Sequence, residues 1–164
     1  MRRTEVVSMT AERVKGRPST GLDLPYFEML WEKIRQDRKA EQLADWLDHR
    51  HPTVFFSQSL KFPTKGEFAL ELMRKFWKRN GFEFCKWNTT LYLFAEKNPS
   101  RDGYHVHGFV CGANPEKIQK IQERLMAYGD VKVERFNPFE RGSFYCAKEY
   151  IEGKSFFDIY PILQ

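Results

Sequence analysis

Two histidines that are separated by one residue, His105 and His107, lie in a segment with the composition of a β-strand, Tyr104–Cys111 (YHVHGFVC). Side chains two residues apart on a strand point to the same face of a sheet, so the two imidazoles should lie together. Such a pair can bind a divalent metal ion, although two histidines on a polar sheet face often have no chemical role. Spacing alone therefore does not decide between these interpretations.

A carboxylate is expected to join the two imidazoles across a β-hairpin. A second strand-like segment, Thr89–Lys97, is followed by turn-forming residues at 98–103. If Lys97 pairs with Tyr104, Glu96 lies opposite His105 and on the same face as both histidines. Two imidazoles and one carboxylate leave coordination positions open for substrate oxygen, and nitrogen ligands favour Mn²⁺ or a later first-row metal over Mg²⁺.

A second His-x-His pair provides an internal comparison. His49 and His51 lie at the predicted exit of a helix, next to Pro52, and no strand partner brings a carboxylate to them. We interpret this pair as having no role in metal binding.

The second group with possible chemistry is a tyrosine beside a lysine. The segment 143–152 is predicted to be helical, and Tyr145 and Lys148, three residues apart, are neighbours on its more exposed side. A phenol can attack phosphorus, but its ordinary pKa near 10 requires help from a cation. The alternative is an interfacial tyrosine beside a solvated lysine. Tyr150 is a weaker candidate, and Tyr104 points away from the proposed metal face.

The remaining segments predict an α+β fold that positions these groups. The predicted order after an N-terminal helix is β-α-β-β-α-β-α, which is that of a ferredoxin-like, split βαβ sheet with helices on one face. The helices are expected at about 25–51, 66–79, 114–129 and 143–152, and the strands at 53–62, 89–97, 104–111 and 130–136. We divide the chain into a flexible basic arm (1–21), a helical extension (22–51), a domain that holds the site (52–155) and a C-terminal tail (156–164).

Composition excludes several classes of protein. The 164 residues have a net charge of +5, and their three scattered cysteines favour a reducing compartment over a disulfide framework. We find no CxxC zinc motif, no GxxxxGK[ST] nucleotide-binding loop, no apolar run long enough to span a bilayer and no signal-peptide core. The charge permits a nucleic-acid partner without requiring one.

Several basic residues are weaker candidates for contacts with a DNA backbone. They are Lys61, Arg74, Lys75, Lys78 and Arg79. The alternative is that the four on the predicted helix are solvated charges that complement the helix dipole.

The motifs, taken in order, resemble those of the HUH endonucleases, and specifically the replication initiator (Rep) proteins of rolling-circle elements. Phe55–Leu60 lies where that family has its first motif, His105-Val106-His107 is the His-hydrophobe-His signature, and Tyr145-Cys146-Ala147-Lys148 fits its YxxK motif. The resemblance covers about residues 53–152. The single late tyrosine differs from conjugative relaxases, and the YxxK lysine differs from small HUH transposases.

This resemblance implies a metal-dependent DNA endonuclease that nicks and rejoins one strand at the origin of a plasmid or virus. Glu96, His105 and His107 would hold Mn²⁺ or Mg²⁺, Tyr145 would become linked to the 5′ phosphate, and Lys148 would stabilise the developing charge. The expected partners are single-stranded or hairpin origin DNA and a host helicase and polymerase, in the cytoplasm of a prokaryotic cell. Neither a membrane nor a nucleotide cofactor is expected.

Three alternatives remain open at the level of sequence. The chain could be a non-catalytic nucleic-acid-binding module of ferredoxin-like fold, in which aromatic side chains stack on bases. It could also be a small HUH transposase. An iron-dependent oxygenase with two histidines and a carboxylate is the weakest alternative, because such sites normally occupy a barrel.

Overall fold

The structure is a computed structural model that describes residues 23–163, and its elements follow the predicted order with one strand added. The arm expected at 1–21 lies outside the described residues. The helices are α2 (Asp23–Asp48), α3 (Gly66–Phe84), α4 (Ile118–Leu125) and α5 (Gly142–Ile151), with short 3-10 helices at Pro115–Lys117, Met126–Tyr128 and Pro138–Glu140. The strands are β1 (Val54–Leu60), β2 (Cys85–Lys97), β3 (Tyr104–Ala113), β4 (Gly129–Arg135) and β5 (Ser155–Leu163).

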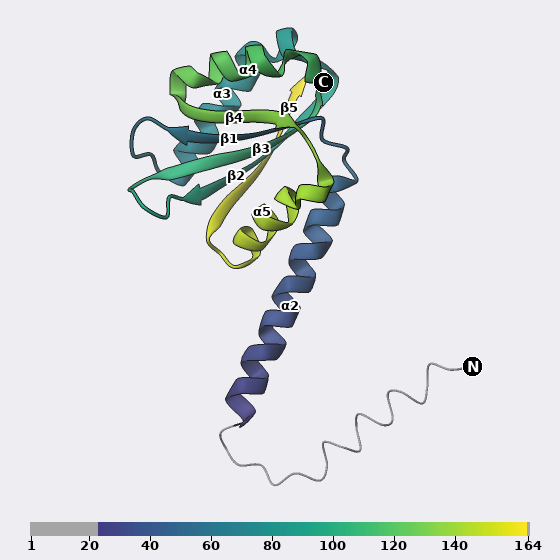
Figure 1. Ribbon diagram of the computed structural model, residues 1–164, viewed down its shortest axis with the longest axis vertical. Helices are drawn as coiled ribbons and strands as arrows, with labels where there is room; N and C mark the ends of the chain where they lie inside the picture. Colours follow the sequence, from purple (N-terminus) through teal and green to yellow (C-terminus); the bar gives the residue numbers. More distant parts are fainter. Residues whose placement is uncertain (1–22, 164) are drawn as a thin grey trace, which may run out of the picture. The chain divides into compact units, whose positions relative to one another are not determined.

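The strands form one antiparallel sheet in the order β4-β1-β3-β2-β5 (Figure 1). The predicted α+β class is therefore confirmed. Where the sequence predicts a C-terminal tail at 156–164, the structure instead has β5, which pairs with β2 from Thr89 to Glu96. Pro161 hides this strand from sequence reasoning, because proline cannot donate to a ladder and is tolerated mainly on edge strands such as this one.

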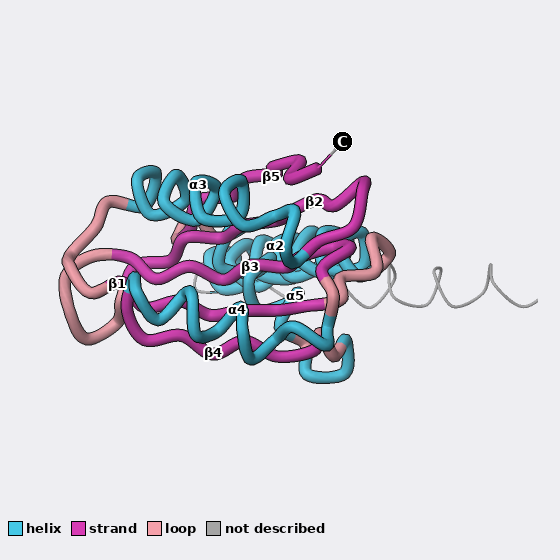
Figure 2. The backbone as a smooth tube through the Cα atoms, turned by 90° about the horizontal axis from the view of Figure 1, so that it is seen from above, coloured by secondary structure: helices cyan, strands magenta, loops and turns pink. Residues whose placement is uncertain are grey.

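Helices cover both faces of the sheet, which corrects the prediction that they lie on one face (Figures 1 and 2). Strand β2 is apolar at both odd and even positions, so each face must be shielded from water. On one face α3 and α4 bury Leu91 and Leu93. On the other, Tyr92 and Phe94 pack in a cluster with Cys146 of α5.

Helix α2 ends at Asp48, close to its predicted end before Pro52. The chain divides into two units between Arg35 and Gln36, so the last part of α2 belongs to the same unit as the sheet. Ala40 and Ala44 pack in a cluster with Ala147 of α5. Within the helical extension proposed for 22–51, the structure has a helix over Asp23–Asp48, and its residues from 36 onward belong to the unit that contains the sheet.

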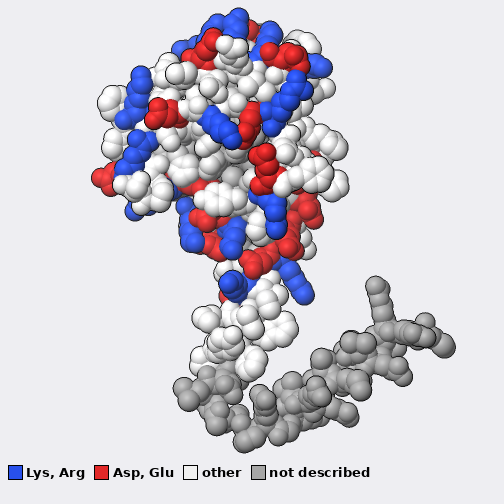
Figure 3. All heavy atoms as spheres, in the orientation of Figure 1, with Lys and Arg blue, Asp and Glu red and all other residues white. Residues whose placement is uncertain are grey.

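One face of the described part of the protein mixes charges of both signs (Figure 3). Lysine and arginine side chains are interspersed with acidic ones over the face displayed in Figure 3. Among the residues that the structure describes, no helix is both long and apolar enough to cross a bilayer.

Gly129 is expected to be the glycine whose replacement by alanine costs the most stability near the site. Its φ of 144° disfavours any side chain, and an added Cβ would lie 2.0 Å from the backbone oxygen of Ser59. We expect Gly129→Ala to lower the free energy of unfolding by about 2–4 kcal/mol in urea denaturation. Gly142→Ala is the matched control, because no atom lies within 4 Å of its added Cβ, and it should be neutral or slightly stabilising. Equal midpoints for the two variants would contradict this account.

Candidate metal centre and tyrosine pocket

The hairpin of β2 and β3 has the predicted register. Lys97 pairs with Tyr104, Glu96 lies opposite His105, and Phe94 lies opposite His107. The turn between the strands is closed by the Asn98 N–H, which donates to the Gly103 oxygen at 2.9 Å. Turn chemistry and strand alternation, both visible in the sequence, are therefore sufficient to bring these side chains to one face.

Three atoms with lone pairs converge there. Nε2 of His105 lies 3.1 Å from Nε2 of His107, and the two nitrogens lie 3.4 and 3.5 Å from Oε2 of Glu96. A triangle with these sides has a centre about 2 Å from each corner, which is the distance at which nitrogen and oxygen ligands bind small divalent ions. The structure thus brings together the three predicted metal ligands with a spacing that fits a shared cation.

Unpaired polar atoms in the same cluster also favour a cation. Glu96 is only 3% exposed, and its second oxygen, Oε1, is buried without a hydrogen-bond partner. A buried carboxylate oxygen without a donor is costly unless another group compensates its charge. A metal ion bound by Glu96, His105 and His107 would supply that compensation.

The surrounding residues hold both imidazoles in place. Nδ1 of His105 lies 3.1 Å from the side-chain oxygen of Asn98, and an amide oxygen can only accept. This contact places the ring proton on Nδ1 and leaves the lone pair of Nε2 facing the cluster. The ring of His107 stacks on Phe55 at 5.9 Å with an interplanar angle of 10°. Sequence reasoning missed both supports, since Asn98 was interpreted only as a turn former.

The histidines also control the ionisation of Glu96. Burial by itself would raise the pKa of this carboxyl, but in the metal-free protein, hydrogen bonds from protonated His105 and His107 and their positive charge outweigh burial and lower the pKa to about 2. Glu96 is therefore a carboxylate at neutral pH, which is the form that binds metal ions.

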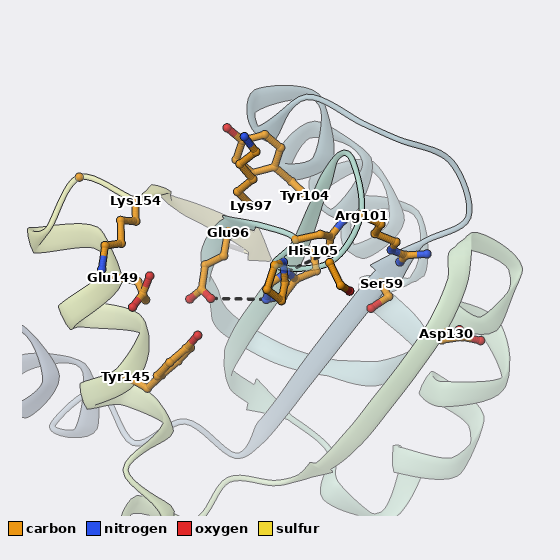
Figure 4. Close-up of a pocket in the computed structure, with 14 residues that line it drawn as sticks. Ser59, Glu96, Lys97, Arg101, Tyr104, His105, Asp130, Tyr145, Glu149 and Lys154 are labelled. Atoms are coloured by element: carbon orange, nitrogen blue, oxygen red, sulfur yellow. Dashed lines mark hydrogen bonds and ion pairs between the residues drawn. The ribbon is translucent and has the colours of Figure 1, made fainter.

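Tyr145 lies across a pocket from this cluster (Figure 4). The pocket has a volume of about 860 Å³, and Glu96, His105 and Tyr145 all line it. The phenol ring is 51% exposed and meets the His107 ring edge to face at 6.1 Å. Partial burial, then the charges of Glu96 and Glu149, raise the pKa of Tyr145 to about 12, so the phenol is neutral unless a cation enters.

Lys148 is directed elsewhere. Its ammonium lies 3.7 Å from Asp37 of α2 and 4.0 Å from Glu152, and it does not line the pocket. Two other lysines line the pocket: Lys97 at the end of β2, and Lys154, which follows α5 and forms an ion pair with Glu152. Sequence reasoning missed Lys154 because the turn from α5 into β5 was not predicted.

Cys146 is a further donor that lies close to the cluster. Its sulfur, one oxygen of Glu96 and one nitrogen of His107 lie within 4.8 Å of one another. The side chain is 1% exposed, and burial raises the pKa of its thiol well above the usual range. No metal-binding role was predicted for Cys146 from the sequence. A sulfur donor suits Zn²⁺ better than Mn²⁺ or Mg²⁺, so its participation would change the metal preference of the site.

Four of the five basic candidates for DNA contacts lie on the opposite face of the sheet from the pocket, on α3. Lys61 follows β1, two residues after Ser59, which lines the pocket. Arg74 pairs with Asp158 at 3.3 Å, and Lys75 pairs with Glu71 at 2.6 Å. Lys78 and Arg79 are exposed. The structure therefore separates the four candidates on α3, but not Lys61, from the tyrosine and its pocket.

The second His-x-His pair lies at the end of α2. Nδ1 of His49 lies 2.6 Å from the backbone oxygen of Asp45, one turn earlier in the same helix. His51 has a left-handed backbone with a φ of 53°. This geometry agrees with the interpretation of the pair as a helix terminus.

Comparisons with known proteins found no relatives. No protein-family model matches the chain, and neither the curated proteins nor the solved structures contain a match. Function must therefore be argued from the site.

Proposed function

We propose that the protein is a metal-dependent DNA endonuclease of the HUH type that nicks and rejoins a single strand to initiate rolling-circle replication of a plasmid or virus. The observation that supports this most is that Tyr145 lines the same pocket as Glu96 and His105. A nucleophile and a three-donor cluster on one pocket are the components needed for phosphoryl transfer to a protein side chain.

In this proposal the tyrosine oxygen attacks phosphorus, the new O–P bond forms, and the bond from phosphorus to the 3′ oxygen breaks. The 5′ phosphate stays on Tyr145, and the 3′ oxygen takes a proton from water to give a free hydroxyl. Glu149 lines the pocket outside the three-donor cluster and accepts the phenolic proton. A bound Mn²⁺ or Mg²⁺ ion supplies Lewis-acid polarisation of the scissile phosphate. The reverse reaction rejoins the strand, since the bond energy is conserved.

The function is tested by forming the covalent adduct. The purified chain is incubated with labelled single-stranded oligonucleotides that include sequences flanking its own coding region, in Mn²⁺ or in EDTA, and resolved on a denaturing gel. We expect an adduct with one or a few sequences in Mn²⁺ and none in EDTA. Oligonucleotide binding that forms no adduct and is insensitive to EDTA and to His107→Ala would instead support a non-catalytic nucleic-acid-binding module. Adducts confined to the ends of a mobile element would indicate a small transposase.

Lys154 rather than Lys148 is expected to stabilise the charge on the transferred phosphate. Lys154 lines the pocket while paired with Glu152, whereas Lys148 does not line it and lies near Asp37 and Glu152. We expect Lys154→Ala to slow adduct formation by about tenfold or more, and Lys148→Ala by less than about threefold. Adduct formation is followed over time at saturating Mn²⁺. The reverse order of effects would assign the role to Lys148, as the YxxK resemblance implies.

A further inference from the structure

Two large aromatic side chains are exposed on the opposite side of the sheet from the tyrosine pocket. Phe82, in the last turn of α3, and Trp87, at the start of β2, are 77% and 68% exposed. Their rings meet edge to face at 6.4 Å with an interplanar angle of 84°. Each ring has an open surface, and rings of this size are usually buried in a core or an interface.

The local backbone holds Trp87 in its exposed position. The pairing of β2 with β3 is irregular between Cys85 and Thr90, and Asn88 adopts a left-handed φ of 62°. The Thr89 hydroxyl donates to the backbone oxygen of Lys86 at 2.5 Å and closes the turn around Trp87. This irregular backbone leaves the Trp87 indole exposed to solvent, next to the regularly paired part of β2.

Three exposed cations lie close to the two rings in the sequence. Lys78 and Arg79 precede Phe82 by four and three residues, so they share its side of α3, and Lys86 is next to Trp87. The nearest acidic residues on α3 are engaged by other cations: Glu83 by Lys120 and Arg124, and Glu71 by Lys75. Among residues 25–163, whose side chains the structure describes, no acidic side chain forms an ion pair with Lys78, Arg79 or Lys86. The surface is thus aromatic and locally positive.

We propose that this surface, made of Lys78, Arg79, Phe82, Lys86 and Trp87, binds single-stranded nucleic acid. Bases stack on aromatic rings whatever their identity, and nearby lysine and arginine side chains contact the phosphates. A duplex could not use the rings, because its bases are already stacked. A protein partner would need acidic groups opposite the three cations and an apolar patch opposite the rings. A single-stranded nucleic acid already provides both, through its phosphates and its exposed bases.

The surface is separate from the tyrosine pocket. Trp87 and Glu96 are nine residues apart on β2, at most about 30 Å at 3.3 Å per residue, and α3 lies across the sheet from α5. It would therefore hold a different segment of the strand from the one that reacts. Binding here requires neither the metal cluster nor the phenol, so it can be tested apart from the proposed nuclease activity.

The test is the affinity of the full chain for a fluorescein-labelled dT20 oligonucleotide, measured by anisotropy in EDTA with the Tyr145→Phe protein so that no adduct forms. Trp87→Leu and Phe82→Leu should each weaken binding by about tenfold, and Trp87→Phe, which keeps a ring, should weaken it much less. The matched control is Phe139→Leu, an exposed aromatic on another element, 92% exposed, which should leave the affinity unchanged.

The charges are tested by the salt dependence of the same affinity. Lys78→Glu combined with Arg79→Glu should reduce the slope of log affinity against log salt by about 1–2. Folding of each variant is checked by circular dichroism, and all the substituted side chains are exposed. Unchanged affinity in the folded Trp87→Leu and Phe82→Leu variants would overturn the proposal. So would oligomerisation of the parent chain that is lost in Trp87→Leu without a change in dT20 binding, since this would make the surface a protein interface.

Discussion

Replacing Tyr145 with phenylalanine is expected to reduce formation of the covalent oligonucleotide adduct by at least about 1,000-fold, because it removes the only atom that the proposed mechanism uses as a nucleophile. The ring is retained, so its edge-to-face contact with His107 at 6.1 Å should persist. The side chain is also 51% exposed, and the loss of one hydroxyl there should not change the thermal midpoint measurably. The measurement is the adduct yield on a denaturing gel in saturating Mn²⁺.

Tyr150→Phe is the matched control on the same helix. Tyr150 is 39% exposed and contacts the Phe94 and Phe157 rings at 6.5 and 5.5 Å, on the apolar cluster rather than in the pocket. We expect its adduct yield to stay within about twofold of the parent. An adduct that survives Tyr145→Phe and disappears in Tyr150→Phe would move the nucleophile to Tyr150. An adduct that still forms in both variants would show that neither tyrosine of α5 is the nucleophile.

The three-donor cluster of Glu96, His105 and His107 was the most predictable part of the molecule because local rules determine it. Turn formers at 98–103 set the hairpin register, and alternation along two strands then places Glu96, His105 and His107 on one face. No long-range contact is needed for that inference. Strand and helix types were predictable for the same reason, since each has its own periodicity.

Features that depend on long-range packing were missed. The lysine of the YxxK motif is adjacent to Tyr145 in helical spacing, but α2 packs along α5 through Ala40 and Ala44, and Asp37 then attracts Lys148 away from the pocket. The proximity of Cys146 to Glu96 depends likewise on how α5 lies across the sheet. Sequence spacing within one helix carries no information about either contact.

Strand β5 was missed for a different reason. The segment Ser155–Leu163 has apolar residues on both sides of its alternation and contains Pro161, so neither the period nor the composition predicts a strand. Its position at the edge of the sheet explains why proline is tolerated. The same strand completes the turn that brings Lys154 to the pocket.

Glu96→Gln is expected to weaken Mn²⁺ binding by about 100-fold or more and to abolish adduct formation at micromolar Mn²⁺. The amide keeps the shape of the side chain but removes the charge on the oxygen that lies 3.4 and 3.5 Å from the two imidazole nitrogens. Loss of a residue that only orients a ligand typically costs 10- to 100-fold in metal affinity, so loss of the anionic ligand should cost at least as much. Free Mn²⁺ is followed by electron paramagnetic resonance, which needs no activity.

Glu149→Gln separates metal binding from the general effect of charge in the pocket. Glu149 also lines the pocket and also raises the pKa of Tyr145, but it lies outside the three-donor cluster. A nearby negative charge disfavours the phenolate, so removing either carboxylate should lower the pKa of Tyr145 from its value of about 12 in the metal-free protein. The pKa of Tyr145 is measured by following the phenolate absorbance at about 295 nm as the pH is raised. The signal of Tyr145 is the difference between each variant and the same variant that also carries Tyr145→Phe.

The two glutamine variants should therefore agree in one measurement and differ in the other. Both substitutions should lower the pKa of Tyr145, because each removes a negative charge that disfavours the phenolate. Partial burial strengthens this effect, since charges interact more strongly away from water. Only Glu96→Gln should lose Mn²⁺ affinity, whereas Glu149→Gln should keep it and slow the covalent step through loss of the proton acceptor. Equal Mn²⁺ affinities in the two variants would show that Glu96 is not a ligand, and the histidine pair would then be a polar sheet face without a metal.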